Sequence, residues 1–170
     1  MLPFRNPLVW LLRFRHRRGY GIHSPFAFNL VTQVLYCPGR YYADDRLDKL
    51  FPWWKRVFCP RMLARHRLLF RLTNYWQPRE IHAPSYASTQ LQSYLHAGCR
   101  KAKIELLDDK VITLKGDRGR MVIVGDLRKR RRRWRQLVDD SRATLTFDLS
   151  DMGVALFLPR MGKQHYIINW

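Results

Sequence analysis

Apolar residues in the first 76 positions recur at helical spacing, and no stretch there alternates as a half-buried strand would. The clearest run places five large side chains on one helical face: Leu68, Leu69, Leu72, Tyr75 and Trp76. Starting signals at Ser24-Pro25, Asp44-Asp45 and Pro60 predict helices over residues 25–35, 44–58 and 60–76. The pattern therefore predicts an all-helical N-terminal region, residues 1–76.

Two segments of this region carry further expectations. In residues 44–58, Asp44 and Asp45 are expected at the helix start, and Pro52 predicts a break near Phe51. The side chains expected to be buried there are Leu47, Leu50, Trp54 and Phe58. Residues 7–18 predict a short basic helix, which would lie on an anionic membrane surface or, as the favoured alternative, pack on the protein's own core.

Beyond Trp76, a very short extended segment at residues 80–82 lies between two predicted helices, 68–76 and 86–96. Helix, strand, turn and helix is how an α/β nucleotide or cofactor site is built. The turn of such a site is usually rich in glycine, because glycine takes positive φ and lets the backbone approach a ligand. The turn here, Ala83-Pro84-Ser85, contains no glycine.

The remaining chain reads as short strands around one helix. Residues 103–107 and 110–115 resemble a hairpin turning at Asp108-Asp109, and residues 121–124 form an apolar run typical of a strand buried on both faces. Further strands are predicted at residues 143–149, 153–158 and 164–170. The fold class is therefore α/β, with residues 77–170 as the α/β region, and the two regions are expected to form one compact domain.

Composition adds a strong basic bias. The 170 residues include 32 Lys and Arg against 13 Asp and Glu, a formal net charge of +19, and 46% of the residues are hydrophobic. The charge favours association with polyanions or anionic lipid, and it fits a merely basic surface equally well. Three distant cysteines predict neither a disulfide framework nor a zinc site, and no apolar run is long enough to span a membrane, so a cytoplasmic protein without metal is expected.

The most basic segment follows the strand at residues 121–124. Leu127, Trp134, Leu137 and Val138 would share one side of a helix, which would connect two strands of the sheet. The cationic residues on its other sides are either a solvated face or a contact for nucleic acid or another polyanion. These candidate polyanion-binding residues are Arg128, Lys129, Arg130, Arg131, Arg132, Arg133 and Arg135.

Two separated blocks resemble class I S-adenosylmethionine-dependent methyltransferases of a group found in the Bacteroidetes. The first block joins His23-Ser24-Pro25-Phe26, after Gly19 and Gly21, to Leu69, Asn74, Tyr75 and Pro78. The second comprises residues 144–149, Asp151-Met152-Gly153 and residues 163–166. The resemblance covers about residues 19–95 and 120–170. It implies a reduced Rossmann-like sheet with antiparallel C-terminal strands, a helical cap, and S-adenosylmethionine as cofactor.

Carried over residue by residue, the cofactor site of that group falls on positions that have changed. Ala83 stands where the acidic residue that ends the first strand is expected. Ser85 and Thr89 stand where glycines are expected. Near the later strand, only Asp126 remains of an expected acidic pair. Asp126 is either a ligand-binding residue at a strand end or the N-cap of the following helix, the favoured interpretation. The resemblance also implies that Tyr20 and His23 lie over the cofactor pocket, and a structural histidine is the alternative.

Three functions remain open from the sequence. The first is a shortened methyltransferase-like protein in which S-adenosylmethionine binding is weak or lost, a pseudoenzyme whose catalytic residues are unknown. The second is a non-catalytic basic module that binds nucleic acid or another polyanion. The third is a non-functional remnant that folds marginally.

Overall fold

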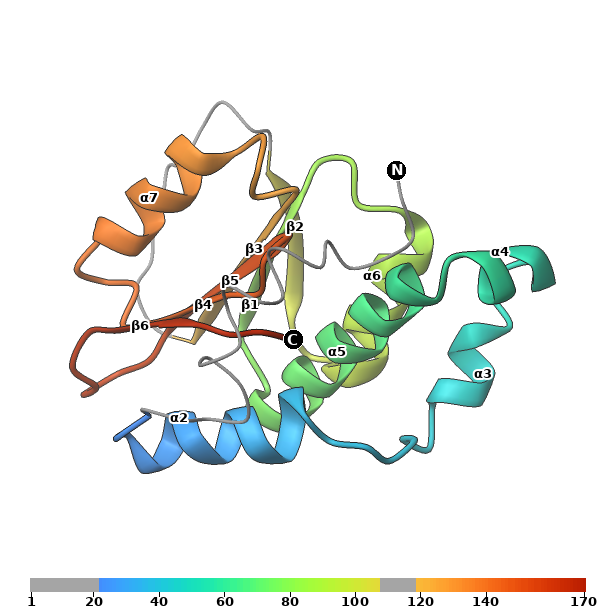
Figure 1. The fold of residues 1–170 in the computed structure, drawn as a ribbon, viewed down its shortest axis with the longest axis horizontal. Helices are drawn as coiled ribbons and strands as arrows, with labels where there is room; N and C mark the ends of the chain where they lie inside the picture. Colours follow the sequence, from blue (N-terminus) through green and yellow to red (C-terminus); the bar gives the residue numbers. More distant parts are fainter. Residues whose placement is uncertain (1–21, 108–118) are drawn as a thin grey trace.

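The computed structural model describes residues 22–107 and 119–170, and its fold is α/β (Figure 1). Residues 22–76 contain helices only, as predicted: α2 (Pro25–Asn29), the π-helix η1 (Leu30–Leu35), α3 (Asp44–Asp48), α4 (Trp53–Phe58) and α5 (Pro60–Trp76). The predicted helix at residues 7–18 and the predicted strand at 110–115 lie outside the described residues.

Local signals set the helix ends. The Ser24 hydroxyl accepts a hydrogen bond from the Ala27 backbone N–H at 3.3 Å, which caps α2. Pro52 separates α3 from α4, and Pro60 begins α5, both as predicted. α5 ends at Gln77, which takes the left-handed φ of 53°.

The prediction that α4 would be buried is wrong. Leu47 of α3 is buried, whereas Trp54 and Phe58 are 46% and 64% exposed and Leu50 is 45% exposed. After the break at Pro52, α4 lies at an edge of the molecule (Figure 1), and none of its residues is buried. Helical spacing thus identified an apolar face correctly, but it did not tell whether another element covers that face.

Within residues 22–107 and 119–170, six strands form one mixed sheet in the order β2-β1-β3-β5-β4-β6. Strands β1, β2 and β3 are parallel, β5 is antiparallel to its neighbours β3 and β4, and β6 is parallel to β4. The strands are β1 (Glu80–Pro84), β2 (Lys103–Leu107), β3 (Arg120–Gly125), β4 (Leu145–Asp148), β5 (Met152–Phe157) and β6 (Gln164–Ile167). One reversed strand therefore lies between two parallel ones in the C-terminal half.

The other two helices of the described residues each connect two strands, and they lie on opposite faces of the sheet. α6 (Thr89–Gly98) follows β1 and packs on α5, and α7 (Arg131–Asp139) connects β3 to β4 on the other face (Figure 1). The alternation of β3 side chains explains both contacts. Met121 and Ile123 join the core beneath α5 and η1, while Val122 and Val124 pack with Trp134 of α7.

The contact between α5 and α6 depends on a residue without a side chain. Gly98 ends α6, and a Cβ at this position would lie 2.6 Å from the Phe70 carbonyl oxygen of α5 and would overlap with Thr73. The two helices therefore approach closely because position 98 is glycine.

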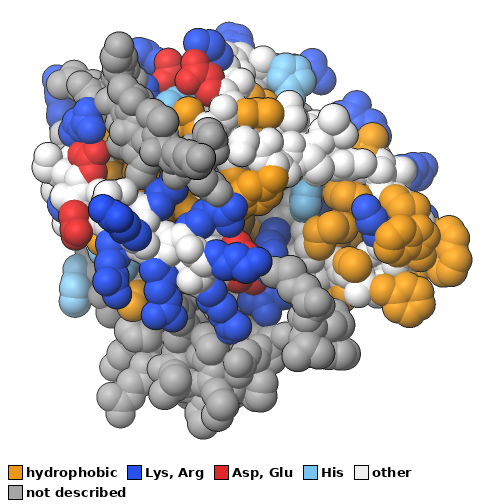
Figure 2. All heavy atoms as spheres, turned by 90° about the horizontal axis from the view of Figure 1, so that it is seen from above, with side chains coloured by type: hydrophobic (Ala, Val, Ile, Leu, Met, Phe, Trp, Pro, Cys, Tyr) orange, Lys and Arg blue, Asp and Glu red, His pale blue; other side chains and the backbone are white. Residues whose placement is uncertain are grey.

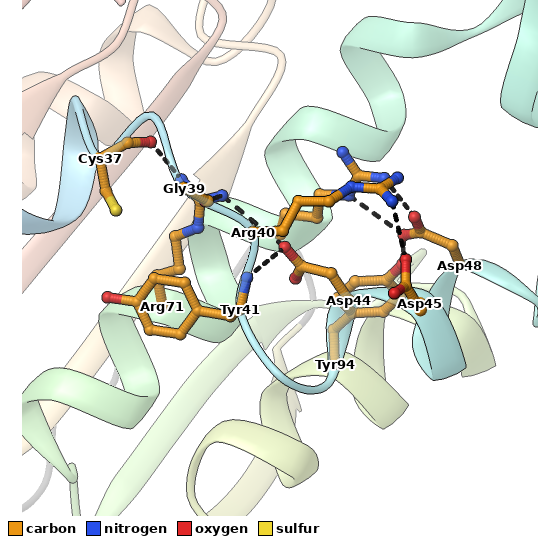
Figure 3. A network of polar contacts seen from close by, with 10 residues as sticks. Cys37, Gly39, Arg40, Tyr41, Asp44, Asp45, Asp48, Arg71 and Tyr94 are labelled. Atoms are coloured by element: carbon orange, nitrogen blue, oxygen red, sulfur yellow. Dashed lines mark hydrogen bonds and ion pairs between the residues drawn. The ribbon is translucent and has the colours of Figure 1, made fainter.

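A buried polar network fastens α3 to the same two helices (Figure 3). Asp48 accepts a hydrogen bond from the Tyr94 hydroxyl of α6 at 2.7 Å and another from Arg67 Nε of α5 at 3.1 Å. Nearby, the Asp44 carboxylate accepts a hydrogen bond from the Tyr41 backbone N–H at 3.0 Å. Asp44 and Asp45 lie in the first turn of α3, as predicted.

Candidate functional site

A cleft of about 340 Å³ opens at the carboxyl ends of the strands, where β3 ends and the turn after β1 begins. β2 and β3 lie on opposite sides of β1, so the direction of strand succession reverses here. Open α/β sheets bind their ligands at such a point. The residues that line the cleft are Arg65, Tyr86, Gly125, Asp126, Lys129, Arg130 and Asp151.

The turn between β1 and α6 closes without glycine because its conformation does not require one. The Ser85 N–H donates a hydrogen bond to the Leu107 carbonyl at 2.9 Å, and the Ala87 N–H donates to the Pro84 carbonyl at 2.8 Å. Residues 83–88 are all described, and none of them has a positive φ. The Ser88 hydroxyl then caps α6 by accepting from the Leu91 N–H at 3.2 Å, so α6 begins three residues later than predicted.

Tyr86 extends from this turn toward the end of β3. Its hydroxyl lies so close to Gly125 that any Cβ at position 125 would overlap with it. The Arg130 guanidinium lies 4.5 Å from the centre of the Tyr86 ring, a cation–π contact. Tyr86 thus occupies space between the ends of β1 and β3 and holds one arginine beside the cleft.

Arg65 of α5 lines the cleft opposite this turn, and Arg61 of the same helix lies beside it. Arg61 Nη2 lies 2.9 Å from Asp151 Oδ2, and Arg65 forms a second ion pair with the same carboxylate oxygen. Burial lowers the pKa of both guanidinium groups, and cationic neighbours lower it further: Arg128 acts on Arg61, and Arg61 acts on Arg65. One carboxylate is therefore shared by two arginines that repel each other.

The cleft and its rim are cationic overall. Five cationic side chains, those of Arg61, Arg65, Arg128, Lys129 and Arg130, gather around two carboxylates, those of Asp126 and Asp151. Figure 2 shows Lys and Arg side chains gathered on this face of the molecule around a small acidic area. Coulomb repulsion among these cations is relieved when an anion binds, so the arrangement favours a phosphate or a similar group.

The positions carried over from the methyltransferase resemblance do not come together in the cleft. Ala83 is buried within β1, and Ser85 and Thr89 are exposed but do not line the cleft. Of these four positions, only Asp126 lines the cleft. The resemblance implies an acidic group where Ala83 stands, and Tyr86 lies against Gly125 beyond it. The described residues therefore do not reproduce the site that the resemblance implies.

Asp126 does not cap the following helix, so the favoured N-cap interpretation is wrong. It has a positive φ of 51°, and its carbonyl accepts hydrogen bonds from the backbone N–H groups of Lys129 and Arg130. This turn delays the start of α7 until Arg131. The Asp126 side chain lies 3.6 Å from Lys129 Nζ and faces the cleft.

The helix α7 places the arginines of the basic run on two sides, one exposed and one facing the sheet. Arg131, Arg132 and Arg135 of α7 are exposed, as is Arg128 in the preceding turn. Arg133 is only 8% exposed, because it lies on the side of α7 that faces the sheet together with Trp134 and Leu137. The prediction that Arg133 contributes to a polyanion contact is therefore wrong, while its exposed neighbours remain available.

Sequence reasoning missed the residues that line the cleft from elsewhere in the chain, namely Arg65, Tyr86 and Asp151, and Arg61, which pairs with Asp151. One signal was present for the two arginines, because no Asp or Glu stands between Asp48 and Glu80. The contact with Asp151, 86 positions beyond Arg65, arises only from the fold. His23 is exposed and does not line the cleft, and Tyr20 lies outside the described residues.

Comparison with known proteins identifies no relative. No family model, curated protein or solved structure matches the chain. Among the described residues, no three His, Cys, Asp or Glu side chains are grouped as metal ligands. No helix in the described part of the chain is long and apolar enough to cross a bilayer.

Proposed function

We propose that this protein is a non-catalytic, methyltransferase-like α/β protein that binds the phosphate groups of a polyanion. The observation that carries the proposal is the concentration of five cationic side chains at the ligand-binding edge of the sheet, with only two carboxylates among them. The exposed arginines of α7 extend the same positive surface beyond the cleft.

The methyltransferase-like part of the proposal is supported by architecture. A helical region precedes the sheet, β1 to β3 are parallel, and the reversed strand β5 agrees with the antiparallel C-terminal strands that the sequence resemblance implies. The loss of S-adenosylmethionine is supported by Ala83 and Tyr86 at the end of β1. In this proposal the reduced Rossmann-like sheet still binds its ligand at the carboxyl ends of its strands, but the ligand is a phosphate group of a polyanion instead of S-adenosylmethionine.

Nucleic acid is the first polyanion to test. Its phosphates are regularly spaced, so a strand can contact the cleft and the exposed side of α7 together. The cleft and the exposed side of α7 present mainly cationic side chains, which contact phosphates and carry no sequence information, so binding is expected to depend little on base sequence.

The test is fluorescence anisotropy with a labelled single-stranded oligodeoxynucleotide at several salt concentrations. We expect saturable binding whose affinity falls steeply as salt increases, because cationic side chains release counterions from the phosphates. An uncharged peptide nucleic acid of the same base sequence is the matched control and should bind at least about tenfold more weakly at low salt. Equal affinity for the two strands, or affinity independent of salt, would contradict the proposal.

A further inference from the structure

The apolar face of α4 is unusual in being left exposed. Trp53, Trp54, Val57 and Phe58 stand at positions i, i+1, i+4 and i+5 and therefore share one side of the helix. They are 66%, 46%, 61% and 64% exposed, and α4 has no buried residue. Soluble proteins seldom expose contiguous apolar side chains of this size unless the surface binds something.

The surroundings of this face are basic. Lys55 and Arg56 lie on the other side of α4, and Lys55 Nζ lies 5.3 Å from the centre of the Trp54 ring. Lys49 precedes the helix and Arg61 follows it, and no Asp or Glu stands between Asp48 and Glu80. Asp48 is paired with Arg67. A partner of this face must therefore tolerate large apolar side chains and carry negative charge.

The α4 face and the cationic cleft are presented on the same side of the molecule. In Figure 2 apolar side chains project at the right edge, over α4, and most of the Lys and Arg side chains gather left of the centre of the same face. A ligand that contacts both must be broad, negatively charged and penetrable by Trp and Phe rings.

From these observations we infer that the α4 face inserts into the headgroup region of an anionic lipid bilayer. Trp and Phe rings partition to the boundary between headgroups and acyl chains, while Lys and Arg stay at the level of the phosphates. The bilayer also presents phosphates to the cleft and to α7. This inference rests on the proposed phosphate binding for its electrostatic part, and the apolar part is independent of it.

A bilayer fits this face better than the alternatives. The apolar side chains project outward, so a protein partner would have to supply a pocket for them within an acidic surface. Single-stranded nucleic acid could stack bases on Trp53 and Trp54, but it offers no apolar contact for Val57 and the neighbouring Leu50, which is 45% exposed.

The test compares vesicles with oligonucleotide in the same set of variants. Trp53→Ser, Trp54→Ser and Phe58→Ser are combined in one variant. Tyr75→Ser with Ile167→Ser is the control, because both control residues are exposed and lie far from α4 in the sequence. Binding is measured by cosedimentation with vesicles of phosphatidylglycerol and phosphatidylcholine, and circular dichroism checks that each variant is folded.

We expect the α4 variant to bind vesicles at least about tenfold more weakly than the control while keeping its affinity for oligonucleotide. Vesicle binding unchanged in the α4 variant would overturn the inference, because attraction would then be due to charge alone. Absence of vesicle binding in the unaltered protein would also overturn it, and so would loss of oligonucleotide affinity in the α4 variant, which would indicate base stacking. Failure of the proposed function is distinct: oligonucleotide would then not bind to any form.

Discussion

Replacing the exposed arginines of α7, Arg131, Arg132 and Arg135, with glutamate is expected to lower the affinity for single-stranded DNA by at least about 100-fold at ~0.1 M salt. Each arginine that contacts a phosphate contributes about one to the slope of log affinity against log salt. The slope should therefore fall by about three. Anisotropy titrations at several salt concentrations measure both quantities.

This variant should remain folded. The three side chains are exposed, and two of them lie in the first turn of α7, where glutamate interacts more favourably with the helix dipole than arginine does. Arg133 is left unchanged because it is buried. A loss of affinity can therefore be attributed to the surface rather than to unfolding.

The matched control reverses the same number of charges at the opposite edge of the sheet. Arg79 precedes β1, and Arg100 and Lys101 precede β2, so these exposed residues lie at the amino ends of the strands. Their replacement by glutamate should change affinity by less than about tenfold, through net charge alone. Equal losses in the two variants would mean that the protein attracts polyanions without a defined site.

Replacing Asp48 with asparagine is expected to lower the free energy of unfolding by about 2–3 kcal/mol at neutral pH. The substitution removes a buried carboxylate and leaves the Arg67 guanidinium without its ionic partner, while the Tyr94 hydroxyl loses a charged acceptor. Three helices meet at this carboxylate (Figure 3), so the loss should appear as a lower midpoint in urea unfolding.

The deficit should depend on pH. Burial alone would raise the pKa of Asp48, but hydrogen bonds from Arg67 and Tyr94 outweigh it, so the pKa in the folded protein lies below its ordinary value. The stabilisation is then fully present above the unfolded pKa of about 3.9 and is lost as pH falls through the folded pKa. The difference between the two proteins should shrink in acid.

Asp45→Asn is the control for this effect. Asp45 lies on the same helix and pairs with Arg40 at 2.9 Å, but both side chains are largely exposed. An exposed ion pair contributes little, so the substitution should change stability by less than about 0.5 kcal/mol. If Asp48→Asn were equally mild, the network would not be what holds α3 in place.

Much of the framework follows from local sequence. The apolar face of residues 68–76, the buried run at 121–124 and the prolines at 52 and 60 each predicted an element that the structure contains. These signals work because spacing and backbone restriction act within a few residues.

Strand pairing did not follow from local sequence. The sequence predicts a hairpin of residues 103–107 and 110–115, and its second half lies outside the described residues. The structure adds a partner that the sequence did not indicate, because residues 103–107 pair in parallel with β1, with Glu80 opposite Lys103. The apolar pattern of a single strand does not indicate which strand it pairs with. The pairing of β2 with β1 depends on α6, which connects the two strands and brings β2 alongside β1.

The candidate site was predicted only in part, for a related reason. Asp126 was identified because it follows a buried strand, and the basic run was conspicuous in composition. The pairing of Arg65 with Asp151 and the approach of Tyr86 to Gly125 join segments that are far apart in the chain. Burial of Arg133 depends on where α7 begins, which a turn at Asp126 delays by several residues.

The most direct test of the central claim is a pair of calorimetric titrations of the unaltered protein, one with pyrophosphate and one with S-adenosylmethionine. Pyrophosphate should give saturable heat, which the combined Lys129→Gln and Arg130→Gln variant should lose, because both side chains line the cleft. S-adenosylmethionine should give no saturable heat at millimolar concentration, about the weakest binding that such a titration detects. Saturable binding of S-adenosylmethionine, with none of pyrophosphate, would contradict the claim.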